Sequence, residues 1–103
     1  MPLTESVSFK AVLQRENRIQ VPRLIRWQYK MEACEVLRVN VRVAGGLVDE
    51  RFLARMTRDG RLTIPKLTLK LLREGEEQSL EGCVLEVTVE PAHEQGEKPE
   101  SNP

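Results

Sequence analysis

Two short phrases decide the fold of this chain: RIQVP at residues 18–22 and RLTIP at residues 61–65. A shift of 43 residues places 9–24 on 52–67, and six of these sixteen aligned positions are identical. The identical pairs are Phe9/Phe52, Ala11/Ala54, Arg15/Arg58, Arg18/Arg61, Pro22/Pro65 and Leu24/Leu67. With five more residues inserted, the match resumes, with VLRVNV (36–41) on VLEVTV (84–89). Two copies indicate an internally duplicated domain rather than a solenoid.

Each copy predicts two strands, a helix and a third strand. Apolar residues alternate along 9–13 and 52–56, and again along 37–43 and 85–89, which is typical of strands with one buried face. Asp59-Gly60 predicts a type I′ hairpin turn with positive φ at both residues, and Asn17 replaces Gly60 in the first copy. Pro22 and Pro65 suit the first turn of a helix, so we expect short helices over 22–30 and 65–73, the second ending near Gly75.

The two copies are expected to complete one another. Gly45-Gly46 predicts a hairpin between them, within 44–50. One three-stranded copy alone would leave open sheet edges and an uncovered apolar face. We therefore predict a mainly β fold: a six-stranded closed barrel of two pseudo-twofold ββαβ repeats with two short helices. The predicted organisation is an N-terminal arm (1–6), one barrel domain (7–90, with repeat one 7–43, turn 44–50 and repeat two 51–90) and a disordered acidic tail (91–103).

Composition limits the kind of core and the location. Hydrophobic residues make up 40% of the chain and aromatic residues only 4%, so Val, Leu and Ile must build the core. The sequence contains no apolar run near the roughly 20 residues of a membrane helix and no signal-peptide pattern, so we expect a cytoplasmic protein without a membrane partner.

Charge is distributed unevenly although the net charge is zero. Residues 1–73 carry 15 basic and 7 acidic residues, whereas 74–103 carry one basic and nine acidic residues. The outward positions of the third strands are Arg38, Asn40 and Arg42 in the first copy and Glu86, Thr88 and Glu90 in the second. Either only one half faces a phosphate backbone, or these charges pair across neighbouring strands.

Cysteine and histidine offer little chemistry. Cys34 and Cys83 belong to no CxxC pair, and the only histidine is His93. Because a structural zinc site needs four ligands, we expect no metal and no other cofactor. Both cysteines are predicted to be small buried apolar side chains.

The phrases ENRIQVP (16–22) and DGRLTIP (59–65) resemble the Gly-Arg-hydrophobic-x-hydrophobic-Pro signature of AbrB/SpoVT-type DNA-binding domains. A chain with both halves is similar to the tandem arrangement of the MraZ family and, more broadly, to the cradle-loop barrels: swapped-hairpin, double-psi, and the RIFT barrels of small archaeal proteins. The resemblance covers about residues 7–90. AbrB-type units usually add a fourth strand, which makes a RIFT-like topology at least equally suitable. The Gly-Asp turn of double-psi barrels is missing.

The resemblance implies nucleic-acid binding through arginines around the hairpin turn and at the start of the following helix. Arg18 and Arg61 match the turn arginine, and Arg26 matches a helix arginine whose counterpart is Leu69. The candidate nucleic-acid-binding residues are Arg18, Arg61, Arg23, Lys66, Arg26, Arg15, Arg58 and Arg55. The expected function is that of a non-enzymatic, AbrB-like nucleic-acid-binding protein, a transcriptional regulator with DNA as its partner.

The alternative is a non-catalytic barrel module for protein–protein interaction or self-association, without DNA binding. MazE antitoxins join an AbrB-like domain to an acidic tail, but the tail here, PAHEQGEKPESNP, lacks a large apolar anchor. No Ser/His/Asp set or paired-carboxylate site is visible, so we expect no enzyme. Trp27 and Tyr29 could stack on a base, although their helical spacing beside Leu24 and Ile25 favours core packing. With both half-barrels in one chain, we expect a monomer.

Overall fold

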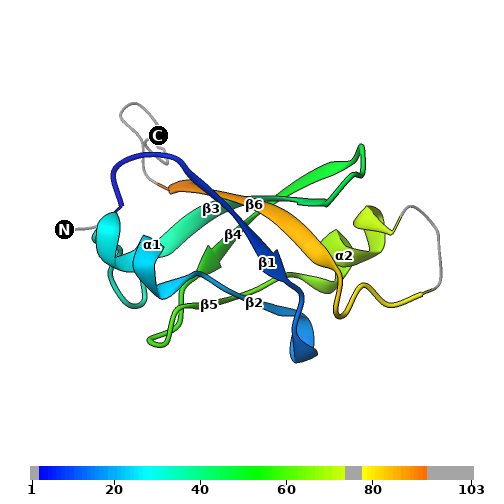
Figure 1. The fold of residues 1–103 in the computed structure, drawn as a ribbon, viewed down its shortest axis with the longest axis horizontal. Coiled ribbons are helices and arrows are strands. Elements are labelled where there is room, and N and C mark those ends of the chain that lie inside the picture. Colours follow the sequence, from blue (N-terminus) through cyan, green and yellow to red (C-terminus); the bar gives the residue numbers. More distant parts are fainter. Residues whose placement is uncertain (1–2, 74–77, 93–103) are drawn as a thin grey trace, which may run out of the picture.

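The computed structural model describes residues 3–73 and 78–92. The elements follow one another as β1 (Val7–Val12), the 3₁₀ turn η1 (Arg15–Asn17), β2 (Arg18–Gln20), α1 (Arg23–Gln28), β3 (Val36–Val43), β4 (Asp49–Arg55), β5 (Arg61–Thr63), α2 (Lys66–Leu72) and β6 (Val84–Pro91). The predicted mainly β fold with two short helices is confirmed (Figure 1).

The strands form a four-stranded sheet and a two-stranded ribbon. The sheet has the order β1-β6-β3-β4, and β2 pairs with β5 in the ribbon; all pairs are antiparallel. Single backbone hydrogen bonds link the sheet to the ribbon on both sides. The Gln14 amide donates to the Arg18 carbonyl at 2.7 Å, and the Thr57 amide donates to the Arg61 carbonyl at 2.9 Å.

The two repeats are related by an approximate twofold axis. The Val21 amide donates to the Gly60 carbonyl at 2.9 Å, and the equivalent Ile64 amide donates to the Asn17 carbonyl at 2.7 Å. Two cross-strand pairs join equivalent positions of the two copies: Ile19↔Leu62 in the ribbon and Asn40↔Thr88 in the sheet. The axis therefore passes through these two pairs.

The core lies between the ribbon and the sheet. The predicted inward positions of the third strands are buried at Leu37, Val39, Val41, Leu85, Val87 and Val89, whereas Val43 is half-buried against the core. Ile19 and Leu62 close the core from the ribbon side, both fully buried. Leu3, in the predicted arm, is also buried, and its amide donates to Glu35 Oε2 at 2.8 Å.

The hairpin turn of the second copy differs from the prediction. Among the described residues, Gly60 has a positive φ of 87°, but Asp59 does not, so the turn is not type I′. The Gly60 amide donates to the Thr57 carbonyl, and the Thr57 amide to the Arg61 carbonyl. These bonds define a three-residue loop with a bulged glycine, which needs positive φ only at its last residue. In the first copy, Glu16 and Asn17 both have φ of 62°.

The start of β4 and the lengths of the two helices also differ from the prediction. β4 begins at Asp49, inside the predicted turn 44–50, because Arg42 pairs with Asp49 at the end of the hairpin. The helices are shorter than predicted and lie at opposite ends of the molecule (Figure 1).

The predicted helix end near Gly75 and residues 93–103 of the predicted tail lie outside the described residues. In the described part of the chain, no helix has the length and apolarity to cross a membrane.

The two cysteines are free thiols, and Cys34 is exposed. Its predicted burial is therefore wrong. Cys34 adopts a φ of 67° at the position where the second copy has Gly82, with φ 88°. This left-handed turn before β3 lies at the surface, so its side chain points away from the core. Cys83 is half-buried.

Candidate nucleic-acid interface

The ribbon places the two central arginines of the prediction on one surface. Because Ile19 and Leu62 point into the core, Arg18 and Arg61 point outward. Arg18 on β2 lies opposite Thr63 on β5, and Arg61 lies two residues before Thr63 on the same strand. Such diagonal neighbours in an antiparallel pair are about 7–8 Å apart. We call this surface, with the flanking hairpin turns, the arginine face; its cations are Arg15, Arg18, Arg58 and Arg61.

Each central arginine of the arginine face already pairs with a carboxylate two residues before it. Arg18 Nη2 lies 3.0 Å from Glu16 Oε1, and Arg61 Nη1 pairs with Asp59 Oδ2. The Thr57 hydroxyl donates to Asp59 at 2.5 Å, and this hydrogen bond, with the charge of Arg61, holds the pKa of Asp59 below its usual range. The centre of the arginine face therefore consists of two ion pairs, in which each arginine charge is balanced by a carboxylate.

Side chains also connect the two copies across this face. Arg61 Nε donates to Gln14 Oε1 at 3.3 Å, so an arginine of repeat two contacts the end of the first hairpin. Gln20 Nε2 donates to the Asp59 carbonyl at 2.8 Å, which joins β2 to the second turn. The two halves thus present one continuous polar surface.

The helix starts bring further cations beside the hairpin turns of the opposite copy. The bond between Val21 and Gly60 brings the segment before Arg23 against the turn that contains Arg58. At the other end of the ribbon, Asn17 and Lys66 line one hollow. Arg23, Lys66, Arg15 and Arg58 are exposed. These four cations therefore lie in two pairs, Arg23 with Arg58 at one end of the ribbon and Lys66 with Arg15 at the other, with Arg18 and Arg61 between them.

Arg26 is held against the second turn. Its Nε donates to the Val21 carbonyl at 3.2 Å. A Cβ atom at Gly60 would lie 2.4 Å from that Nε, so a side chain at this position would displace the guanidinium of Arg26. Arg26 has no cationic counterpart in the second copy, where Leu69 is buried in the core.

Arg55 contacts the loop before β3 and not the hairpin turns of the arginine face. It lies on β4, and its Nη1 donates to the Cys34 carbonyl at 2.9 Å, in the loop before β3.

The opposite charges of the third strands lie side by side. β3 and β6 pair so that Arg42 is opposite Glu86 and Arg38 is opposite Glu90. Arg42 Nη2 lies 2.5 Å from Glu86 Oε1, and this hydrogen bond raises the pKa of Arg42 above its ordinary value. The ion pair between Arg42 and Glu86 therefore agrees with the second interpretation of the sequence, in which opposite charges pair across neighbouring strands.

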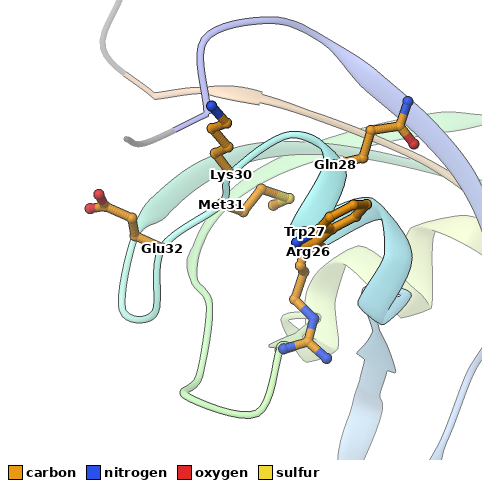
Figure 2. Close-up of a pocket in the computed structure, with 6 residues that line it drawn as sticks. All are labelled: Arg26, Trp27, Gln28, Lys30, Met31 and Glu32. Carbon is orange, nitrogen blue, oxygen red and sulfur yellow. The ribbon is translucent and has the colours of Figure 1, made fainter.

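The predicted core packing of Trp27 is also wrong. Its side chain is 77% exposed, and Leu24, one turn earlier, is 73% exposed. Ile25 and Tyr29 pack against the core in its place. A six-residue helix has one inward face, and residues 25 and 29 occupy it at i,i+4 spacing. Trp27 lines a hollow of about 660 Å³ with Arg26, Gln28, Lys30, Met31 and Glu32 (Figure 2).

Among residues 3–73 and 78–92, no group of three or more His, Cys, Asp and Glu side chains is placed to hold a metal ion.

No protein-family model and no curated protein matches this chain. A solved structure that it resembles is the solution structure of PHS018 from Pyrococcus horikoshii. The two share 24% sequence identity with a TM-score of 0.65, and the match covers 86% of this chain and 91% of that one. At this identity, the likeness shows a shared fold and nothing of function.

Proposed function

We propose that this chain is a non-enzymatic nucleic-acid-binding protein and that the arginine face is its phosphate-binding surface. The observation that carries the proposal is the outward, diagonal placement of Arg18 and Arg61 on a two-stranded ribbon, with cations at both ends. Arginine suits this task because its planar guanidinium can bind phosphate oxygens in pairs. The described residues contain 15 basic and 10 acidic residues, so this part of the chain is cationic although the whole is neutral.

The ion pairs at the centre of the face do not oppose this role. Glu16 and Asp59 are mostly exposed, with side-chain exposures of 75% and 60%. Exposed ion pairs contribute little to stability because water and salt screen them. A phosphate group can therefore replace each carboxylate at Arg18 or Arg61 without disturbing the fold.

We also propose that the sheet and the ribbon close into one six-stranded barrel of the cradle-loop type. The bonds Gln14–Arg18 and Thr57–Arg61 support this, because they connect β1 to β2 and β4 to β5 and so complete a ring of neighbours. A closed ring leaves no free sheet edge. Amide exchange tests the closure: the Gln14 and Thr57 amides should exchange as slowly as those in β3, and rapid exchange at both would contradict it.

The binding test compares two charge-matched double variants. Arg18→Ala with Arg61→Ala removes the centre of the arginine face, whereas Lys10→Ala with Arg51→Ala removes two exposed cations from the four-stranded sheet. We expect the first variant to abolish binding to DNA in a low-salt fluorescence titration and the second to bind like the wild type. Each phosphate contact contributes about 0.9 to the slope of log K against log salt for a duplex. Full affinity in the first variant would refute the proposal.

The exposed apolar residues on the helices favour a protein-interaction module as the second candidate. Leu24 and the equivalent Leu67 are 73% and 65% exposed. If the chain associates with itself through them, its sedimentation coefficient should rise with protein concentration, and Leu24→Ala should abolish that rise. A constant monomeric value would argue against self-association.

A further inference from the structure

Trp27 stands on the surface of α1 in a setting unlike that of an ordinary core tryptophan. It is 77% exposed, although large aromatic side chains are highly buried on average. Figure 2 shows its ring beside the hollow, at the surface of the helix, with Arg26 extending from the adjacent position. The fold does not need this ring, because Ile25 and Tyr29 dock the helix onto the core.

Three cations lie within four residues of the ring in the sequence: Arg23, Arg26 and Lys30. Arg23 precedes Trp27 by four residues on the same short helix, so the two side chains share one face. Arg26 and Lys30 line the hollow with it, together with the carboxylate of Glu32. Arg26 Nε donates to the Val21 carbonyl, and the head group of Arg26 lies against Gly60, where the absence of a Cβ leaves space for it.

The second copy lacks this arrangement. Lys70 occupies the position equivalent to Trp27, and buried Leu69 the position equivalent to Arg26. Other features of the helix are kept in both copies, since Leu24 matches Leu67 and Arg23 matches Lys66. The exposed ring of Trp27 and the adjacent Arg26 therefore occur in one copy only, and the fold that both copies share does not require them.

Resting on the nucleic-acid-binding function proposed above, we propose that α1 selects single-stranded nucleic acid, with a base stacked on Trp27 and the adjoining phosphates on Arg23 and Arg26. An exposed aromatic ring among cations is what a single strand requires, because its unpaired bases offer flat apolar faces and its backbone is anionic. A duplex offers the same phosphates but keeps its bases stacked on one another. Trp27 thus adds affinity for single strands only.

The chain contains one tryptophan, so its intrinsic fluorescence reports on this site alone. Three ligands separate the contributions: a 12-nucleotide oligothymidine, an abasic 12-mer with the same phosphates, and a 12-base-pair duplex. We expect oligothymidine to quench the fluorescence of Trp27 and to bind more tightly than the abasic strand. The abasic strand and the duplex should bind through the arginine face with little quenching.

Variants then test the ring itself. Trp27→Ala should weaken oligothymidine binding about 5- to 150-fold, the effect expected for one stacked base, and leave the other two ligands unchanged. Because this variant has no tryptophan, its affinities are measured from the fluorescence anisotropy of a dye on each ligand. Trp27→Phe should restore most of the loss. Lys70→Ala, at the equivalent position of α2, is the matched control and should affect all three ligands alike. Equal urea midpoints for these variants, measured by circular dichroism, would show that folding is intact.

The outcomes distinguish the two proposals. If all three ligands bind equally and without quenching, the stacking role is refuted while the arginine face stands. If none binds, the nucleic-acid function fails and the stacking role fails with it. Quenching that rises with protein concentration in the absence of DNA would assign Trp27 to self-association and would also overturn the inference.

Discussion

A substitution at Gly60 tests whether the second hairpin turn and α1 stabilise one another. Two costs are expected for Gly60→Ala. Its φ of 87° is unfavourable for any residue with a Cβ, at about 1–2 kcal/mol. The added Cβ would also lie 2.4 Å from Arg26 Nε and displace its hydrogen bond to the Val21 carbonyl, worth about 1 kcal/mol.

Gly82 supplies the matched control. It has nearly the same φ, 88°, but a Cβ there would meet nothing within 4 Å. Gly82→Ala should therefore lower the free energy of unfolding by about 1–2 kcal/mol, and Gly60→Ala by about 2–3 kcal/mol. Because 1 kcal/mol shifts Tm by roughly 4–8 °C in a domain of this size, the difference is measurable. Urea unfolding gives both values directly.

A double-mutant cycle isolates the contact with Arg26. Arg26→Ala removes the side chain that the new Cβ would meet, so Gly60→Ala should cost no more in that background than Gly82→Ala does. An equal cost for the two glycine variants in the wild-type background, or a cost at Gly60 that Arg26→Ala leaves unchanged, would refute this account of the turn.

Three further predictions follow from burial, backbone geometry and the turn. Leu37→Ala should destabilise the protein by about 2–5 kcal/mol in urea unfolding because Leu37 is fully buried, whereas Leu47→Ala, at a side chain 92% exposed, should be neutral. Cys34→Gly should stabilise the protein by about 0.5–1 kcal/mol in the same assay, because glycine adopts the φ of 67° without the steric strain of a Cβ atom. The pKa of Asp59 is lowered in the folded state, so its stabilisation is present above about pH 4 and is lost as pH falls. The stability difference between wild type and Asp59→Asn should therefore shrink between pH 7 and pH 2, and a constant difference would contradict the role of the Thr57 and Arg61 contacts.

The sequence was sufficient for the elements whose pattern is periodic. The alternation along 37–43 and 85–89 predicted both central strands, observed at Val36–Val43 and Val84–Pro91, because a strand in a half-buried sheet must alternate. The prolines at 22 and 65 placed the helix starts to within one residue. These features depend on near neighbours in the chain.

The errors concern features that the periodic pattern does not determine. Asp59-Gly60 suggested a tight two-residue turn, but the loop closes through Thr57 and Arg61 and carries Arg26 of the other repeat against Gly60. Trp27 has helical spacing that suits either face of α1, and only the docking of Ile25 and Tyr29 decides which face is inward. For the candidate site, the sequence supplied the arginines, but not the carboxylates that pair with them.

The opposite charges of the two third strands have a physical explanation in the twofold axis. The axis passes through Asn40 and Thr88, so the residue opposite Arg38 is the counterpart of Arg42 in the other copy. With identical copies, arginine would therefore face arginine at both of these positions, and like charges directly opposite one another destabilise a sheet. A dimer of identical halves could avoid this only by changing one of the two positions in both copies, whereas a fused chain can change one copy alone. Glutamates at 86 and 90 are that change. The same freedom allows Trp27 and Arg26 to appear on α1 while α2 keeps a lysine and a buried leucine, so the duplication that completes the fold also permits a one-sided surface.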